Sequence, residues 1–212
     1  MGDILRRRGM MKKASGGGSR LPAGYTEVEY IESSGTQYIQ TNIVPRDTKT
    51  ECDFQFSVAA ESTIVGKWDG SNQRYYAVQI DANKKFKFGN RSNTSKWTGG
   101  SDTNRHTIVF NDSSHGAYLD NSLKATDSTF ACTGGSCGIG LFARTCYNEP
   151  TESYASGKIF HVKFTNNATD EVLGEFIPCV RDADSVAGMY DLVTNAFFGN
   201  NGTGSFTAGS PV

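Results

Sequence analysis

Hydrophobic and polar residues alternate with a period of two along most of the chain beyond residue 20. The clearest run spans residues 51–58, where Cys52, Phe54, Phe56 and Val58 alternate with polar side chains. This period is typical of a β-strand that buries one face. Shorter runs, each bounded by Gly, Asn, Asp or Ser, occur at Tyr76/Val78/Ile80, Phe86/Phe88, His106/Ile108/Phe110, Ala117/Leu119, Cys137/Ile139/Leu141/Ala143 and Phe160/Val162/Phe164.

The order of these segments predicts the fold class. No stretch beyond residue 20 keeps an apolar period of 3.6, so we expect no helices between the strands, and parallel βαβ units are disfavoured. Short strands that follow one another favour an antiparallel two-sheet sandwich. At a spacing of roughly 8 to 12 residues, about ten to twelve strands fit the chain. The sequence has no long internal repeat, which argues against a propeller or a solenoid.

Charge divides the chain into an arm and a body. Residues 1–20 carry six of the 21 basic residues and one of the 22 acidic residues, which gives +5 and leaves −6 on the remainder. We therefore expect a basic arm at residues 1–13, a Gly/Ser-rich linker at 14–20 and one domain at 21–212. An acidic body offers no broad positive field to nucleic-acid phosphates, so we expect no specific nucleic-acid partner.

The first residues of the chain and its cysteines indicate the cellular compartment of the protein. The first residues lack the apolar stretch and cleavage site of a secretory signal, so we expect synthesis without export. No apolar run is long enough for a membrane span. The five cysteines lack a CxxC pair or zinc spacing, which favours buried thiols. A local Cys132–Cys137 bridge is the alternative in an oxidising compartment.

Four strings along the body resemble a known family. Together they are similar to the laminin-G-like, concanavalin A-like jelly rolls of bacteriophage structural proteins and gut-bacterial surface proteins, over roughly residues 21–209. The resemblance implies an all-β, antiparallel two-sheet jelly-roll sandwich with a short N-terminal arm, opened and closed by the first and last strings. Asn121 stands where the family's hairpin usually has glycine, and asparagine also tolerates the left-handed conformation. The strings are LPAGYTEVEYIESSGTQYIQTNIVP (21–45), RHTIVFNDSSHGAYLDNS (105–122), SGKIFHVKF (156–164) and FIPCVRDADSVAGMYDLVTNAFFGNNGTGSFTAG (176–209).

The opening MGDILRRRGMMKK resembles the starts of phage virion proteins that carry such a module. The resemblance implies that the protein is made in the host cytoplasm and then located in the virion, as a capsid decoration or tail-fibre component. A homo-oligomer is compatible with this location. An arm of this kind would bind other virion proteins, while packaged nucleic acid, anionic lipid or plain solvation are alternatives for its arginines. The anchor residues are Ile4, Leu5, Arg6, Arg7, Arg8, Met10 and Met11.

Several aromatic and polar residues in predicted loops are candidates for sugar binding. A sugar needs an aromatic face for its C–H groups and a few rigid polar groups for its hydroxyls. We expect a non-enzymatic, lectin-like protein that attaches particles to bacterial or mucosal glycans through many weak contacts. The alternative is a purely structural decoration protein whose tryptophans cap the sandwich. The candidates are Trp68, Asp69, Tyr75, Trp97, Arg144 and Tyr147.

The chain also holds a weak candidate for glycoside hydrolysis. Some members of the superfamily are glycosidases with an E-x-D-x-x-E or E-x-D-x-E pattern, which Glu27, Glu29 and Glu32 approach. Retaining hydrolysis needs two carboxyls about 5 to 5.5 Å apart on one face, and Glu32 would need a bulge to join Glu27. The competing interpretation is an exposed acidic edge strand. We expect no cofactor; calcium, which some family members bind, has only the scattered candidates Asp69, Asp81 and Asp120.

Overall fold

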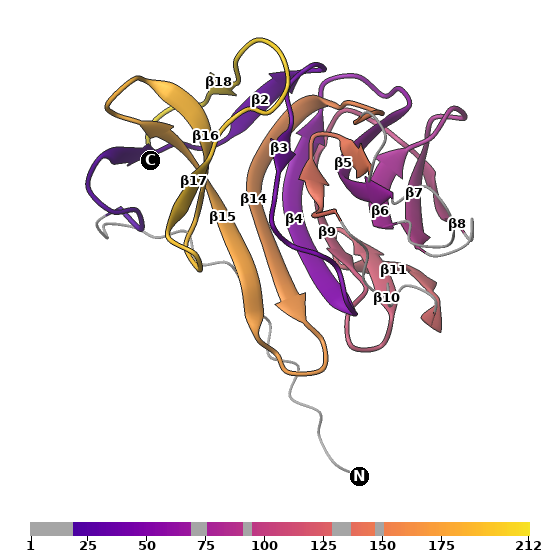
Figure 1. Cartoon of the computed structure of the whole chain (residues 1–212). Helices are drawn as coiled ribbons and strands as arrows, with labels where there is room; N and C mark the ends of the chain where they lie inside the picture. Colours follow the sequence, from indigo (N-terminus) through magenta and orange to yellow (C-terminus); the bar gives the residue numbers. More distant parts are fainter. Residues whose placement is uncertain (1–18, 69–75, 91–94, 129–136, 147–150) are drawn as a thin grey trace.

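The structure is a sandwich of two β-sheets (Figure 1). This computed structural model describes residues 19–68, 76–90, 95–128, 137–146 and 151–212. None of these segments forms a helix long and apolar enough to cross a membrane. The predicted all-β, two-sheet class is therefore confirmed. The strands are β1 (Tyr25–Glu27), β2 (Ile31–Ser34), β3 (Ile39–Gln40), β4 (Thr48–Phe56), β5 (Ser62–Trp68), β6 (Tyr76–Ile80), β7 (Lys85–Asn90), β8 (Ser95–Gly100), β9 (Arg105–Phe110), β10 (Gly116–Leu119), β11 (Ser122–Thr126), β12 (Gly140–Leu141), β13 (Arg144–Cys146), β14 (Ser156–Asn166), β15 (Val172–Arg181), β16 (Val186–Asp191), β17 (Ala196–Phe198) and β18 (Thr207–Ala208).

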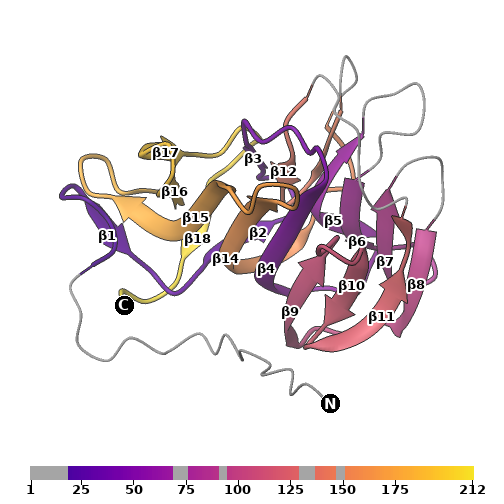
Figure 2. The same cartoon turned by 90° about the horizontal axis from the view of Figure 1, so that it is seen from below.

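The larger sheet combines strands from the beginning and from the end of the body. The larger sheet runs β11-β10-β9-β4-β14-β15-β16-β17, with β1 on β15 and with β2 between β14 and β18. The smaller sheet runs β3-β12-β5-β6-β7-β8, and β13 pairs with β5 in parallel, while the other strand pairs described are antiparallel. Figure 2 places β1 at one end of the molecule and β8 at the other.

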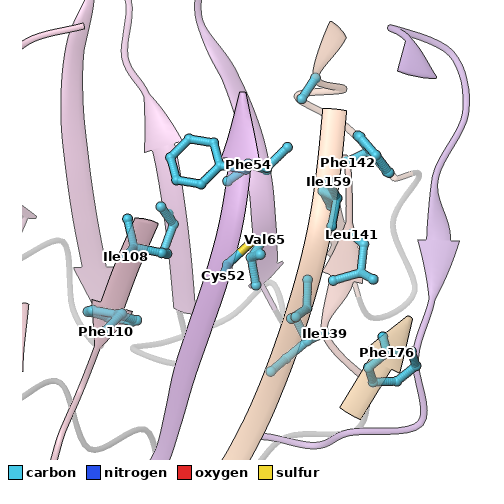
Figure 3. Close-up of a cluster of buried hydrophobic side chains, with 14 of the residues drawn as sticks. Cys52, Phe54, Val65, Ile108, Phe110, Ile139, Leu141, Phe142, Ile159 and Phe176 are labelled. Atoms are coloured by element: carbon cyan, nitrogen blue, oxygen red, sulfur yellow. The ribbon is translucent and has the colours of Figure 1, made fainter. Parts of the chain in front are cut away.

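The hydrophobic core lies between the two sheets. The alternation of apolar and polar residues in β4 explains which of its side chains enter the core. Cys52, Phe54 and Phe56 point inward and are almost wholly buried, as the period of two predicts. They join Val65 of the smaller sheet and Ile159 of β14 in one apolar cluster (Figure 3). This packing fixes how the two sheets face each other, and so positions the loops that connect their edges.

Three details of the predicted strands are wrong. Val58 lies beyond the end of β4 and is 55% exposed. The strand expected from Cys137 to Ala143 is limited to Gly140–Leu141, because Phe142 adopts a left-handed conformation with φ 63° that interrupts the side-chain alternation. The described residues also hold eighteen strands rather than ten to twelve, since several are only two to four residues long. The predicted hairpin turn is confirmed, with Asp120 and Asn121 both at positive φ.

Candidate functional site

The structure brings together two of the predicted sugar-binding residues, Trp68 and Arg144. Trp68 ends β5, and the parallel pairing of β13 with β5 places Arg144 opposite Gly66. The guanidinium carbon of Arg144 lies over the Trp68 ring, 5.4 Å from its centroid, and the guanidinium also forms an ion pair with Glu152. The indole is half-buried and shares its surface with a cation. It is therefore only a partial platform for a sugar ring.

The structure does not bring the second predicted tryptophan to this point. Trp97 lies in β8 opposite Lys87 of β7, and its side chain falls outside the described part of the structure. β8 is three strands away from β5, about 14 Å at the usual strand spacing. Trp68 and Trp97 thus occupy different regions of the smaller sheet. Three further candidates, Asp69, Tyr75 and Tyr147, lie outside the described residues, as do all the anchor residues of the arm.

The three glutamates of the hydrolase alternative lie in β1, in β2 and in the segment between these two strands. Glu27 lies in β1, which pairs with β15, whereas Glu32 lies in β2, which pairs with β14 and β18. Glu27 is buried and binds the guanidinium of Arg20, so the expectation of an exposed acidic edge is wrong at this residue. Glu32 accepts a hydrogen bond from the Ser57 hydroxyl at 3.2 Å, and Glu29 is exposed between the strands. The three carboxyls therefore lie on three separate segments of the chain and have different partners.

The aspartates considered for calcium serve local turns. Asp81 accepts hydrogen bonds from the backbone amides of Asn83 and Lys85. Asp120 accepts one from the backbone amide of Thr107 and also contacts a histidine ring. Asp69 lies outside the described residues. Within the described ranges, no group of three or more His, Cys, Asp or Glu side chains is arranged to hold a metal ion.

A pocket that the sequence did not reveal lies where three connections meet. Its volume is about 420 Å³ and it is open to solvent. The connection from β2 to β3, the segment before β14 and the loop after β17 supply its walls; β2, β14 and β17 are labelled in Figure 1. None of the lining side chains carries a charge. They are Gly35, Thr36, Tyr38, Thr151, Tyr154, Asn201, Gly202 and Thr203.

Tyr38 and Tyr154 give this pocket its chemistry. Their rings meet edge to face, with centroids 5.9 Å apart and planes at 69°. Both are half-buried, and within the described chain neither hydroxyl has a hydrogen-bond partner. Burial, and then the neighbouring Tyr38, raise the pKa of Tyr154, so its hydroxyl stays protonated at neutral pH. The pair therefore offers aromatic surface together with two hydroxyl groups that can bind a ligand.

Backbone hydrogen bonds hold the pocket in shape. The amide of Tyr38 donates to Asn200 Oδ1 at 3.1 Å, and the amide of Asn201 donates to the Tyr38 carbonyl at 2.8 Å. The amide of Thr203 donates to the Thr36 carbonyl at 3.1 Å. Glycine is required at residue 202, because a Cβ there would lie 2.1 Å from the Thr36 carbonyl oxygen. The pocket is thus largely preformed, which lowers the entropy cost of binding.

No protein-family model matches the chain, and no curated protein matches it. A proposal about function therefore rests on the residues, their geometry and the family resemblance of the four strings.

Proposed function

We propose that this chain is a non-enzymatic, carbohydrate-binding structural protein of a phage particle, and that the Tyr38–Tyr154 pocket binds its glycan. The observation that carries the proposal is a pair of half-buried tyrosines in a preformed and uncharged pocket, whose hydroxyls have no hydrogen-bond partner among the described residues. A sugar ring has an apolar C–H face that packs on an aromatic ring and hydroxyls that need donors and acceptors. The lining threonines and Asn201 supply such groups beside the rings.

The absence of charge among the lining side chains limits the ligand class. An acidic sugar would bury its carboxylate here without a cation to compensate it, and this is unfavourable. A neutral sugar meets no such cost. Because the pocket is open, a single site is expected to bind weakly, and many copies on one particle would turn weak sites into useful adhesion.

The position of the termini suits display on a particle. The body begins beside β1 at one end of the molecule, whereas β5, the strand that Trp68 ends and that pairs with β13, lies toward the other end (Figure 2). An arm bound to a virion protein would leave the smaller sheet facing outward. Trp68 and Arg144 would then serve as a second contact for a longer glycan.

Truncating Tyr154 tests the pocket directly. We expect Tyr154→Ala to weaken glycan binding about tenfold through loss of the aromatic contact, and Tyr154→Phe to weaken it less. The measurement is retention of the full chain, displayed in many copies, on a glycan array. Tyr30→Phe is the matched control, since Tyr30 is half-buried but packs on Phe160, away from the pocket. Equal retention of Tyr154→Ala and the wild type, or no retention of the wild type, would contradict the proposal.

The release of reducing ends, measured in the same wells, distinguishes the hydrolase alternative from glycan binding without catalysis. We expect no product from the wild type, and unchanged glycan retention by Glu29→Gln, because Glu29 is exposed and lies outside the pocket. A product that disappears in Glu29→Gln would establish the enzyme instead. Silence in both measurements would favour a decoration protein without a ligand.

A further inference from the structure

A groove adjoins the Tyr38–Tyr154 pocket. Its volume is about 640 Å³, and its walls are the β15–β16 turn, the first residues of β16 and the loop that follows β17. We call it the β16 groove. The loop after β17 forms a wall of both hollows: residues 201–203 line the pocket, while their neighbours on both sides, together with residue 202, line the groove.

The residue that the pocket and the groove share is a glycine. Gly202 lines both of them, and the Thr36 carbonyl oxygen leaves no room for a Cβ at this position. No side chain therefore rises from the shared residue. A chain-like ligand can lie across Gly202 with one part in the pocket and the next part in the groove.

The groove is polar and carries one charged pair on its wall. Arg181 Nε and Nη2 donate to Asp184 Oδ1 and Oδ2 at 3.0 and 2.6 Å, and the Val186 amide donates to Oδ1 at 3.3 Å. No other lining residue is charged, and the two charges compensate each other. The groove therefore suits a neutral ligand, as the pocket does. The pair still has further N–H groups on the guanidinium and a free lone pair on Asp184 Oδ2.

These polar groups are held in place before a ligand binds. The guanidinium carbon of Arg181 lies 4.6 Å from the centroid of the Phe197 ring, which fixes the plane of the guanidinium. The hydrogen bonds from Arg181 lower the pKa of Asp184, so its carboxylate is ionised and accepts hydrogen bonds at neutral pH. Ser185 and Ser205 also line the groove, and among the described residues neither hydroxyl has a hydrogen-bond partner. Groups that are fixed in this way lower the entropy cost of binding.

This chemistry fits the hydroxyl groups of a sugar. One hydroxyl can accept from the guanidinium of Arg181 while its neighbour on the ring donates to the carboxylate of Asp184. Arg181 and Tyr25 already cover the Phe197 ring, so the groove would hold its sugar by hydrogen bonds, whereas the pocket offers aromatic contact. Both volumes lie within the range of about 300 to 1,000 Å³ that is usual for small-molecule sites.

We propose that the pocket and the β16 groove are neighbouring subsites for one neutral oligosaccharide, whose adjacent sugar residues lie on either side of Gly202. The inference rests on the proposed function, because it extends the site of the glycan that the pocket binds. The groove borders the pocket wall formed by the loop after β17, whereas Arg144 pairs with Glu152 beside the wall formed by the segment before β14. The groove and the Trp68–Arg144 contact therefore extend the pocket at different walls.

The length of the sugar chain distinguishes the two subsites. The probes are glucose, galactose, mannose and N-acetylglucosamine, arrayed with their neutral oligosaccharides of increasing length, and the full chain is displayed in many copies. We expect wild-type retention to rise about tenfold from a monosaccharide to its oligosaccharides, since the groove adds hydrogen bonds to a charged pair. Asp184→Asn should remove most of this gain and leave monosaccharide retention unchanged, because the pocket is intact.

Asp182→Asn is the matched control. Asp182 lies in the same exposed turn and accepts a hydrogen bond from the Thr26 hydroxyl at 2.8 Å, but it does not line the groove. We expect this variant to retain every probe as the wild type does. Thermal unfolding of both variants shows whether the fold is kept. Tyr154→Ala, in contrast, should lower retention at every chain length.

Three results would overturn the second subsite alone. They are equal wild-type retention of monosaccharides and oligosaccharides, a gain with length that persists in folded Asp184→Asn, and a loss of the gain that is equal in Asp182→Asn and Asp184→Asn. In each case the pocket stands if Tyr154→Ala still weakens binding. No retention of any probe by the wild type would overturn the proposed function and the second subsite together.

Discussion

Replacing Phe54 by alanine is expected to lower the free energy of unfolding by about 3 to 5 kcal/mol. Phe54 is fully buried in β4, and its ring packs against Phe56 and Phe86 with centroids 5.4 and 6.2 Å away. Both sheets are anchored on this cluster, so they cannot close the cavity that the ring leaves. Urea unfolding of the two proteins, compared at equal slope, measures the loss.

Val58→Ala is the matched control for the same alternating run. Val58 is 55% exposed, so its truncation should change the free energy of unfolding by less than about 0.5 kcal/mol. A loss in Val58→Ala comparable with that in Phe54→Ala would mean that the buried face continues past Phe56, contrary to the structure.

These two residues also mark how far alternation predicts a β-protein. It identifies the buried face of β4 because a period of two fixes which side chains share a face. It fails at Val58 because the pairing of β4 ends at Phe56 and the chain turns, with the Ala60 amide bonded to the Val58 carbonyl at 3.0 Å. Where a strand stops depends on its partner, and a single sequence does not reveal the partner.

The segment around β12 shows a second limit. The alternation predicted that Ile139, Leu141 and Ala143 are buried, and all three are, but Phe142 between them is buried as well. The positive φ of Phe142 interrupts the alternation, so consecutive side chains enter the core. Nothing about a phenylalanine in an apolar run signals a left-handed residue, because the conformation is imposed by the surrounding packing.

The candidate sites also include residues that the sequence predicted and residues that it did not. Trp68 and Arg144 were two of six candidates of suitable types in predicted loops; both instead lie in strands, and the pairing of β13 with β5 places them together. Tyr38 and Tyr154 were missed, because they lie far apart in the sequence and meet only through the pairing of distant segments. The one local signal was the turn-forming run of Asn, Gly and Thr at residues 200–204, which forms part of the pocket wall.

The second large effect on the free energy of unfolding is expected at a histidine whose ring lies between two carboxylates. His106 Nδ1 lies 2.7 Å from Asp120 Oδ2, and its Nε2 lies 2.9 Å from Asp102 Oδ1. Both nitrogens donate only when the ring is protonated. The ring also packs against Phe54 and Phe86, with centroids 6.2 and 5.3 Å away. The protonated ring therefore ties the loop before β9 and the β10–β11 turn to the core.

The pKa shifts in this cluster set the direction of its pH dependence. Burial lowers the pKa of His106, but the hydrogen bonds and charges of Asp120 and Asp102 outweigh it, so the pKa lies above its ordinary value. The stabilisation is then fully present below the unfolded pKa of about 6.5 and is lost as the pH rises through the folded pKa. The backbone amide of Asn104, and then His106, lower the pKa of Asp102, so its contribution is lost only in acid.

His106→Gln is expected to lower the free energy of unfolding by about 1 to 3 kcal/mol near pH 6, because it removes charged hydrogen bonds. The loss should shrink as the pH rises, since the wild type itself loses the protonated ring, whereas the packing lost against Phe54 is the same at every pH. Asp120→Asn keeps an acceptor for Thr107 and a turn-compatible residue, and should show a smaller effect of the same sign. Urea unfolding of the three proteins from pH 6 to pH 9 measures the difference. A gap between wild type and His106→Gln that stays constant over this range would mean that the histidine contributes by packing alone.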